Sequence, residues 1–124
     1  MGRITFESLP GKKPLKDRIN IVLSRDETFE NSCVTICRSI DELLQELKKY
    51  NNHEVYSIGG EDVYRQLLPY CDEALVTKIE HQFDADKYFL RLDSDKDWEM
   101  ISVSDAHSYN NILFRFTKYV KLNR

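Results

Sequence analysis

The sequence has little of what a disulfide framework, a structural metal site or a membrane anchor requires. Its three cysteines, an odd number without a C-x-x-C pair, are Cys33, Cys37 and Cys71. Its three histidines, which show no H-x-x-H spacing, are His53, His81 and His107. No segment reaches the roughly 18 apolar residues of a membrane span, and no apolar run near the N-terminus is typical of a secretory signal. We therefore expect reduced thiols, no metal, no membrane contact and a cytoplasmic protein.

Charge of either sign is not in strong excess. Lysine and arginine number 18 against 21 aspartate and glutamate residues, which gives a net charge of −3. Without a basic field over the domain, we expect no nucleic-acid partner. Lys118, Lys121 and Arg124 lie beside Phe116 and Tyr119, and alternating charge on an exposed strand accounts for them better than a nucleic-acid site. The length of 124 residues indicates a single domain spanning residues 1–124 with its own core.

Helix-like and strand-like segments alternate along the chain, which predicts an α/β fold. A short helix is expected to begin near Gly2 and to stop at Leu9-Pro10-Gly11. The segment Ser39-Ile40-Asp41-Glu42 fits the capping box of a second helix. The further elements that we expect are strands over 19–23, 34–36, 55–58, 74–79, 98–103 and 112–122 and helices over 40–47 and 61–68.

Two strand arrangements follow from this order. The closely spaced strand, helix and strand over 55–79 favour a parallel pair joined by a right-handed crossover. The last third instead predicts an antiparallel hairpin around Tyr109-Asn110-Asn111. We therefore expect a mostly parallel sheet with flanking helices and a C-terminal antiparallel hairpin.

Four places carry residues suited to binding charged ligands. Glycine precedes a helix at Gly2 and at Gly59-Gly60, where a phosphate could approach the backbone, although a plain turn explains glycine there at least as well. Ser24 and Arg25 follow a strand, where a hydroxyl beside a guanidinium suits a phosphate monoester, and a solvated loop is the alternative. Arg18 precedes the same strand and suits a carboxylate, or is a surface residue.

Other chemistry finds less support. Neither G-x-G-x-x-G nor a P-loop sequence is present, and no Ser-His-Asp or Cys-His order is recognisable. Asp84 and Asp86 could serve a cation or a glycosidase, but two acids in a loop are more often solvated.

Five blocks in order resemble the dihydrofolate reductase family over almost the whole chain. They are residues 1–9 (MGRITFESL), 14–25 (PLKDRINIVLSR), 55–64 (VYSIGGEDVY), 75–79 (LVTKI), and 83–86 (FDAD) with Trp98-Glu99. The chain departs from the family at Leu90, where proline is usual, and at Asp17, where glycine is frequent.

The resemblance implies an NADPH site and a dihydrofolate site. Arg3 and Thr5 would hold the cofactor phosphates, Ser24 and Arg25 the 2′-phosphate, and Arg38 would flank the adenine. Gly59 and Gly60 would be joined by a cis peptide beside the nicotinamide and pyrophosphate. The remaining residues assigned to the cofactor are Ile4, Leu23, Ile58, Glu61, Asp62, Val63 and Tyr64.

On the substrate side, the resemblance assigns Arg18 to the glutamate tail of folate. Ser8, Leu15, Ile58 and Tyr64 would line the folate site. Thr77 would hydrogen-bond the catalytic acid.

That acid has no counterpart in these 124 residues, because family members carry about forty residues ahead of the Met-Gly-Arg block. The resemblance therefore implies that a central strand, a mobile loop and the acid are missing. We expect an enzyme of one-carbon metabolism that reduces 7,8-dihydrofolate to tetrahydrofolate, represented by a chain that is itself inactive and self-associates, whereas the full-length family is monomeric. The alternatives are an inactive NADPH-binding remnant and a reductase of riboflavin biosynthesis on the same fold, against which Arg18 and Thr77 argue.

Overall fold

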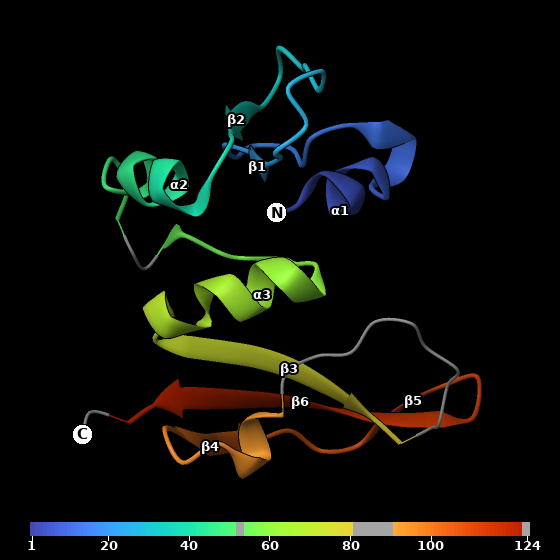
Figure 1. The fold of residues 1–124 in the computed structure, drawn as a ribbon. Helices are drawn as coiled ribbons and strands as arrows, with labels where there is room; N and C mark the ends of the chain where they lie inside the picture. Colours follow the sequence, from blue (N-terminus) through green and yellow to red (C-terminus); the bar gives the residue numbers. More distant parts are fainter. Residues whose placement is uncertain (52–53, 81–90, 123–124) are drawn as a thin grey trace. The chain divides into compact units, whose positions relative to one another are not determined.

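A computed structural model describes residues 1–51, 54–80 and 91–122. These residues form two compact units, Met1–Leu67 and Leu68–Arg124, each of which is described by itself (Figure 1). The prediction of a single domain stays a prediction. Several residues named above lie outside the described residues: His53, His81, 83–86, Leu90 and Arg124.

The first unit contains three α-helices and a parallel strand pair. Its elements are α1 (Arg3–Glu7), the 3-10 helix η1 (Pro10–Lys12), β1 (Ile21–Leu23), β2 (Thr35–Cys37), α2 (Ile40–Leu47) and α3 (Glu61–Leu67). β1 and β2 pair in parallel, with Val22 opposite Ile36. α1 contacts β1 and α2 contacts β2, and the core includes Phe6, Val22, Cys37 and Leu43.

Local signals in the sequence are confirmed in this unit. α1 ends before Pro10, and Gly11 takes a positive φ of 66° in the turn that follows. At α2, the backbone N–H of Glu42 donates to the Ser39 hydroxyl at 3.1 Å, as the capping box predicts. The Glu42 carboxylate, however, accepts from the N–H of Arg38 at 3.0 Å rather than from that of Ser39. The Glu42 side chain therefore bonds to the N–H of the residue before the N-cap, whereas the capping box predicts a bond to the N–H of the N-cap itself.

The second unit is a four-stranded antiparallel sheet. Its elements are the 3-10 helix η3 (Leu68–Tyr70), β3 (Glu73–Ile79), the 3-10 helix η4 (Leu92–Ser94), β4 (Trp98–Val103), β5 (His107–Tyr109) and β6 (Ile112–Lys121). β6 lies between β3 and β4 and also pairs with β5 (Figure 1). The predicted turn is confirmed, since Asn110 and Asn111 both have positive φ. The segments 98–103 and 112–122, predicted as the two arms of the hairpin, do pair antiparallel as β4 and β6, but the arm next to the turn is β5, which was not predicted. The core consists of Leu92, Trp98 and Tyr119 with the partly buried residues around them.

Two expectations about pairing are wrong for the described residues. Residues 55–58 are not in a strand, and β3 pairs antiparallel with β6, so the predicted parallel crossover pair is not formed there. The described ladders are one parallel and three antiparallel, which differs from a mostly parallel sheet. A strand forms only where a neighbouring backbone takes up its N–H and C=O groups, and an alternating sequence does not specify that neighbour.

Candidate functional site

Gly2 joins three segments of the first unit. Its N–H donates to the carbonyl of Gly59 at 2.8 Å, and it forms a parallel bridge with Leu23 at the end of β1. Gly2 is also the N-cap of α1. The entrance of α1, the end of β1 and the Gly59-Gly60 segment therefore meet at one residue, as the sequence interpretation required.

The segment from Gly59 to Tyr64 is closely packed against α1. The peptide bond between Gly59 and Gly60 is cis, which confirms what the family resemblance implied. A Cβ on Gly60 would lie 3.5 Å from the hydroxyl oxygen of Thr5. The N–H of Tyr64 donates to the carbonyl of Gly60 at 2.9 Å, and burial raises the pKa of the Tyr64 phenol. The two glycines therefore let the Tyr64 ring pack against the backbone of Gly59 and the Thr5 hydroxyl lie beside Gly60.

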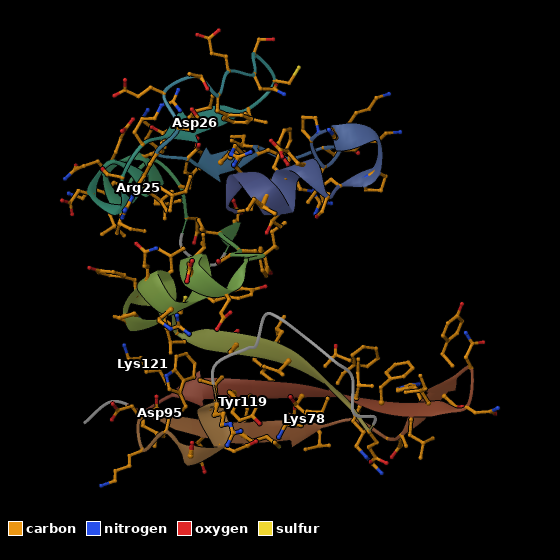
Figure 2. The ribbon with its side chains drawn as sticks, turned by 45° about the vertical axis from the view of Figure 1, so that its right-hand side comes forward. Arg25, Asp26, Lys78, Asp95, Tyr119 and Lys121 are labelled. Carbon is orange, nitrogen blue, oxygen red and sulfur yellow. The ribbon has the colours of Figure 1, made fainter. Side chains whose placement is uncertain are left out.

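Ser24 and Arg25 begin the loop that follows β1. Figure 2 labels Arg25 and the next residue of this loop, Asp26. Ser24 is buried, and its N–H donates to the carbonyl of Cys37 at 2.9 Å. Its hydroxyl oxygen accepts from the N–H of Asp26 at 3.2 Å, which leaves the hydroxyl hydrogen available to a ligand. The Arg25 side chain is exposed. The loop therefore holds a hydroxyl in place beside a solvent-facing guanidinium.

Arg38, which directly follows β2, forms hydrogen bonds to this loop. Its guanidinium donates to the carbonyl of Asp26 and, at 2.9 Å, to the carbonyl of Phe29. These bonds show that Arg38 organises the loop. Its position beside an adenine stays a prediction. Hydrogen bonds from Thr28, with smaller contributions from Arg3 and Arg38, hold the pKa of Asp26 below its usual value. Asp26 therefore stays ionised within the loop at neutral pH.

A groove of about 360 Å³ lies between the end of β1 and α3. It is lined by Leu23, Arg25, Asp62, Val63, Arg65 and Gln66. Arg65 and Gln66 were missed by the sequence interpretation. The available signal was their helical spacing. Arg65 lies three residues after Asp62 and Gln66 lies four residues after it, and residues at these spacings share a helix face.

Other predicted ligand residues of α1 are partly engaged. Arg3 forms an ion pair with Glu7 at 2.9 Å, and the Ser8 hydroxyl donates to the carbonyl of Thr5 at 2.6 Å. The Ile4 side chain is exposed. Arg3 would have to share its guanidinium between Glu7 and a phosphate.

Asn20 organises the segment that carries Leu15 and Arg18, and the sequence interpretation missed this role. Its side-chain oxygen accepts from the N–H of Leu15, and its amide donates to the carbonyls of Leu15 and Arg18, at 2.9, 2.9 and 3.1 Å. Asn20 is buried, whereas the Arg18 side chain is exposed and donates from Nε to the carbonyl of Lys16 at 3.0 Å. The two terminal nitrogens of Arg18 make no hydrogen bond to the described residues and suit a carboxylate.

Thr77 belongs to the second unit. It lies opposite Phe116 in the pairing of β3 with β6, on a sheet face that also carries the exposed side chains of Leu75 and Ile79. The described surroundings of its hydroxyl on this face are therefore largely apolar.

A second cavity, of about 500 Å³, lies wholly in the second unit. Its lining includes Lys78, Asp93 and Tyr119. The Asp93 carboxylate accepts hydrogen bonds from Lys78 Nζ and from the Tyr119 hydroxyl, each at 2.6 Å, and Lys78 Nζ lies over the Tyr119 ring. Lys78 and Tyr119 are labelled in Figure 2. These bonds lower the pKa of Asp93 and raise that of Lys78. The charges of Lys78 and Asp93 compensate each other, and the neutral Tyr119 phenol donates a second hydrogen bond to the carboxylate.

Within the described residues, no group of three metal-ligating side chains comes together. Likewise, no described helix combines the length and apolar character needed to cross a bilayer.

A sequence model described as dihydrofolate reductase matches residues 1–121. The chain belongs to the dihydrofolate reductase family. This is a family of oxidoreductase enzymes that act on dihydrofolate. The cis Gly59-Gly60 peptide and the colinear blocks agree with that membership.

Individual relatives agree with the family assignment. The chain is 37% identical over 103 residues to a dihydrofolate reductase of Staphylococcus haemolyticus, a match that covers 83% of this chain and 59% of the relative. It is 36% identical over 132 residues to a bifunctional dihydrofolate reductase-thymidylate synthase of Plasmodium chabaudi, covering 98% of this chain and 22% of the relative. It is 33% identical over 125 residues to a dihydrofolate reductase of Bacillus subtilis, covering 99% and 71%. The chain thus spans less than two thirds of the first two relatives.

Proposed function

We propose that the first unit of this chain binds NADPH, and that the chain belongs to an enzyme that transfers hydride from NADPH to 7,8-dihydrofolate, giving tetrahydrofolate for one-carbon metabolism. The observation that carries the proposal is the meeting of three segments at Gly2. Through it the Thr5 hydroxyl, the Gly59-Gly60 backbone and the loop of Ser24 and Arg25 belong to one neighbourhood.

The residues of this neighbourhood fit a phosphorylated dinucleotide. The groove contributes the guanidinium of Arg25, and Ser24 retains a hydroxyl hydrogen, which together suit a phosphate monoester such as the 2′-phosphate. The partly buried backbone of Gly60 lies beside the Thr5 hydroxyl, and Gly59, with φ of 99°, packs against the Tyr64 ring. When bound, NADPH supplies the hydride. The chain's own residues hold the phosphates and orient the cofactor.

The substrate side is proposed from the segment ordered by Asn20. Arg18 would pair with the carboxylate of the folate tail through its terminal nitrogens, and Leu15 and Ser8 would line the approach. Ile58 and Tyr64 would lie between substrate and cofactor. These roles rest on the family resemblance together with the exposure of the Arg18 side chain.

Reduction of dihydrofolate also needs a proton, which an acid must deliver to the substrate. None of the 124 residues is assigned this role. The Thr77 hydroxyl would position that acid, and its neighbours on the described sheet face are the apolar side chains of Leu75, Ile79 and Phe116. We therefore expect the chain by itself to bind NADPH without reducing dihydrofolate. Its self-association stays a prediction.

The test is a calorimetric NADPH titration of the purified chain, paired with an assay of NADPH oxidation in the presence of dihydrofolate. Saturable binding that Arg25→Gln weakens about tenfold or more supports the proposal, because a charge-assisted bond to phosphate is lost. Arg91→Gln removes an exposed arginine of the second unit and is the matched control. A folded chain without NADPH binding would refute the proposal, and turnover would refute only the expected inactivity.

A further inference from the structure

The groove beside Arg25 contains charges of both signs. Arg25 comes from the loop after β1, and α3 contributes Asp62 and Arg65. The Asp62 side chain is 81% exposed, so water solvates its carboxylate and the group keeps its negative charge. An acid in this position opposes the binding of an anion at Arg25.

Arg65 is placed to offset that acid. Its guanidinium lies 2.9 Å from the carboxylate of Glu61 and 3.5 Å from that of Asp62, one helical turn earlier. With Arg65 present, the four side chains Arg25, Glu61, Asp62 and Arg65 carry no net charge. Without it, they carry one net negative charge.

The consequence depends on the ligand. A ribose 2′-hydroxyl is neutral and is little affected by one negative charge. A 2′-phosphate carries about two negative charges at neutral pH, so repulsion from the Asp62 carboxylate, which lines the same groove as Arg25, matters much more when that carboxylate is uncompensated. The charge balance of α3 therefore bears on the choice between phosphorylated and unphosphorylated dinucleotides.

We infer that Arg65 is a specificity-determining positioning residue: it holds and neutralises Glu61 and Asp62, so that the groove accepts a 2′-phosphate at Arg25. This inference rests on the proposed binding of NADPH in the first unit. Arg65 acts through the two carboxylates.

The experiment compares 2′,5′-ADP, which carries the 2′-phosphate, with 5′-AMP, which lacks it, by calorimetric titration of the whole chain. Arg65→Gln is expected to weaken 2′,5′-ADP roughly three- to tenfold and to change 5′-AMP by less than about twofold. Arg65→Lys, which keeps the charge, should bind like the original chain. Arg65→Gln combined with Asp62→Asn should recover most of the lost affinity.

Two controls separate electrostatics from folding. Exposed ion pairs within a helix contribute little to folding stability, so the variants should fold, which circular dichroism checks. Arg115→Gln breaks an exposed ion pair with Glu80 at 3.8 Å in the second unit and should alter neither ligand's affinity. The effect of Arg65→Gln should also shrink at high salt, because added ions screen exposed charges.

The titrations distinguish a failure of the role of Arg65 from a failure of nucleotide binding itself. If the original chain binds both nucleotides and Arg65→Gln changes neither or both equally, the role of Arg65 is refuted while nucleotide binding stands. If the folded chain binds neither nucleotide, the proposed function and this inference are refuted together. An Asp62→Asn exchange that fails to rescue Arg65→Gln would also overturn the inference.

Discussion

The ring of Tyr64 lies against the backbone of Gly59. A Cβ on Gly59 would be 2.9 Å from Cε2 of Tyr64 and 3.1 Å from Cζ, closer than real Cβ contacts. Gly59 also has φ of 99°, which side chains rarely adopt. Two independent constraints therefore require glycine at the centre of the proposed cofactor site.

We expect Gly59→Ala to lower both the free energy of unfolding and the affinity for NADPH. The positive φ costs about 1 kcal/mol or more, and displacement of the Tyr64 ring adds a comparable amount. Urea denaturation measures the first and calorimetric titration the second. Gly11→Ala is the matched control, because Gly11 has φ of 66° but its nearest neighbours are flexible Lys13 atoms at 3.7 Å. Equal losses in the two variants would show that Tyr64 does not constrain the site.

Replacing Asn20 tests the segment that carries Arg18. Asn20→Ala removes three hydrogen bonds to the backbone of Leu15 and Arg18 and leaves buried groups unpaired, so we expect a loss of about 1–3 kcal/mol in the free energy of unfolding. Asn31→Ala, which removes one exposed bond to the N–H of Cys33, should cost much less. Similar losses in both variants would contradict the organising role of Asn20. Chemical denaturation monitored by circular dichroism provides the measurement.

Removing the guanidinium of Arg38 should loosen the loop after β1. Arg38→Ala deletes the bonds to the carbonyls of Asp26 and Phe29, so backbone amides of residues 26–31 should exchange faster with deuterium. NADPH affinity should fall several-fold, since Ser24 and Arg25 precede this segment. Lys48→Ala, an exposed change at the end of α2, serves as control. Unchanged exchange over 26–31 would rule out the loop-organising role.

The bonds of Asp93 predict an acid-sensitive contribution to the stability of the second unit. Because hydrogen bonds from Lys78 and Tyr119 lower the pKa of Asp93 in the folded chain, ionised Asp93 stabilises that state above its unfolded pKa of about 3.9. This contribution is lost as the pH falls through the lowered value. Asp93→Asn should therefore be less stable at neutral pH and should lose less stability on acidification. Urea midpoints between pH 7 and acidic pH measure the difference, and parallel pH curves for both chains would contradict the assignment.

Much of the local structure follows from neighbouring residues alone. Ser39 caps α2, Pro69 follows the end of α3, and Asn110 and Asn111 form the turn between β5 and β6. Each depends on hydrogen bonds or backbone angles within a few residues, which a sequence pattern displays directly. The family blocks are likewise visible in the chain order.

Partners far apart in the sequence were harder to predict. Residues 55–58 have the β-branched and aromatic composition of a strand yet take no strand partner in the described structure, and β3 instead pairs with β6. Arg38 and Asn20 each bond to backbone carbonyls of loops, a role that residue type alone does not indicate. The role of Arg65 depends on α3 lining the same groove as Arg25, which residue spacing within the helix does not indicate.

The order of residues along the chain indicates the family, the positions of the α-helices and turns, and the need for glycine where backbone must come close to a neighbour. That Gly2 joins α1, β1 and Gly59, and that α3 brings Asp62 and Arg65 to the groove of Arg25, follows from the folded chain. The physical reason is range: caps and turns are satisfied within a few residues, whereas strand partners and groove charges depend on which distant segments fold against one another.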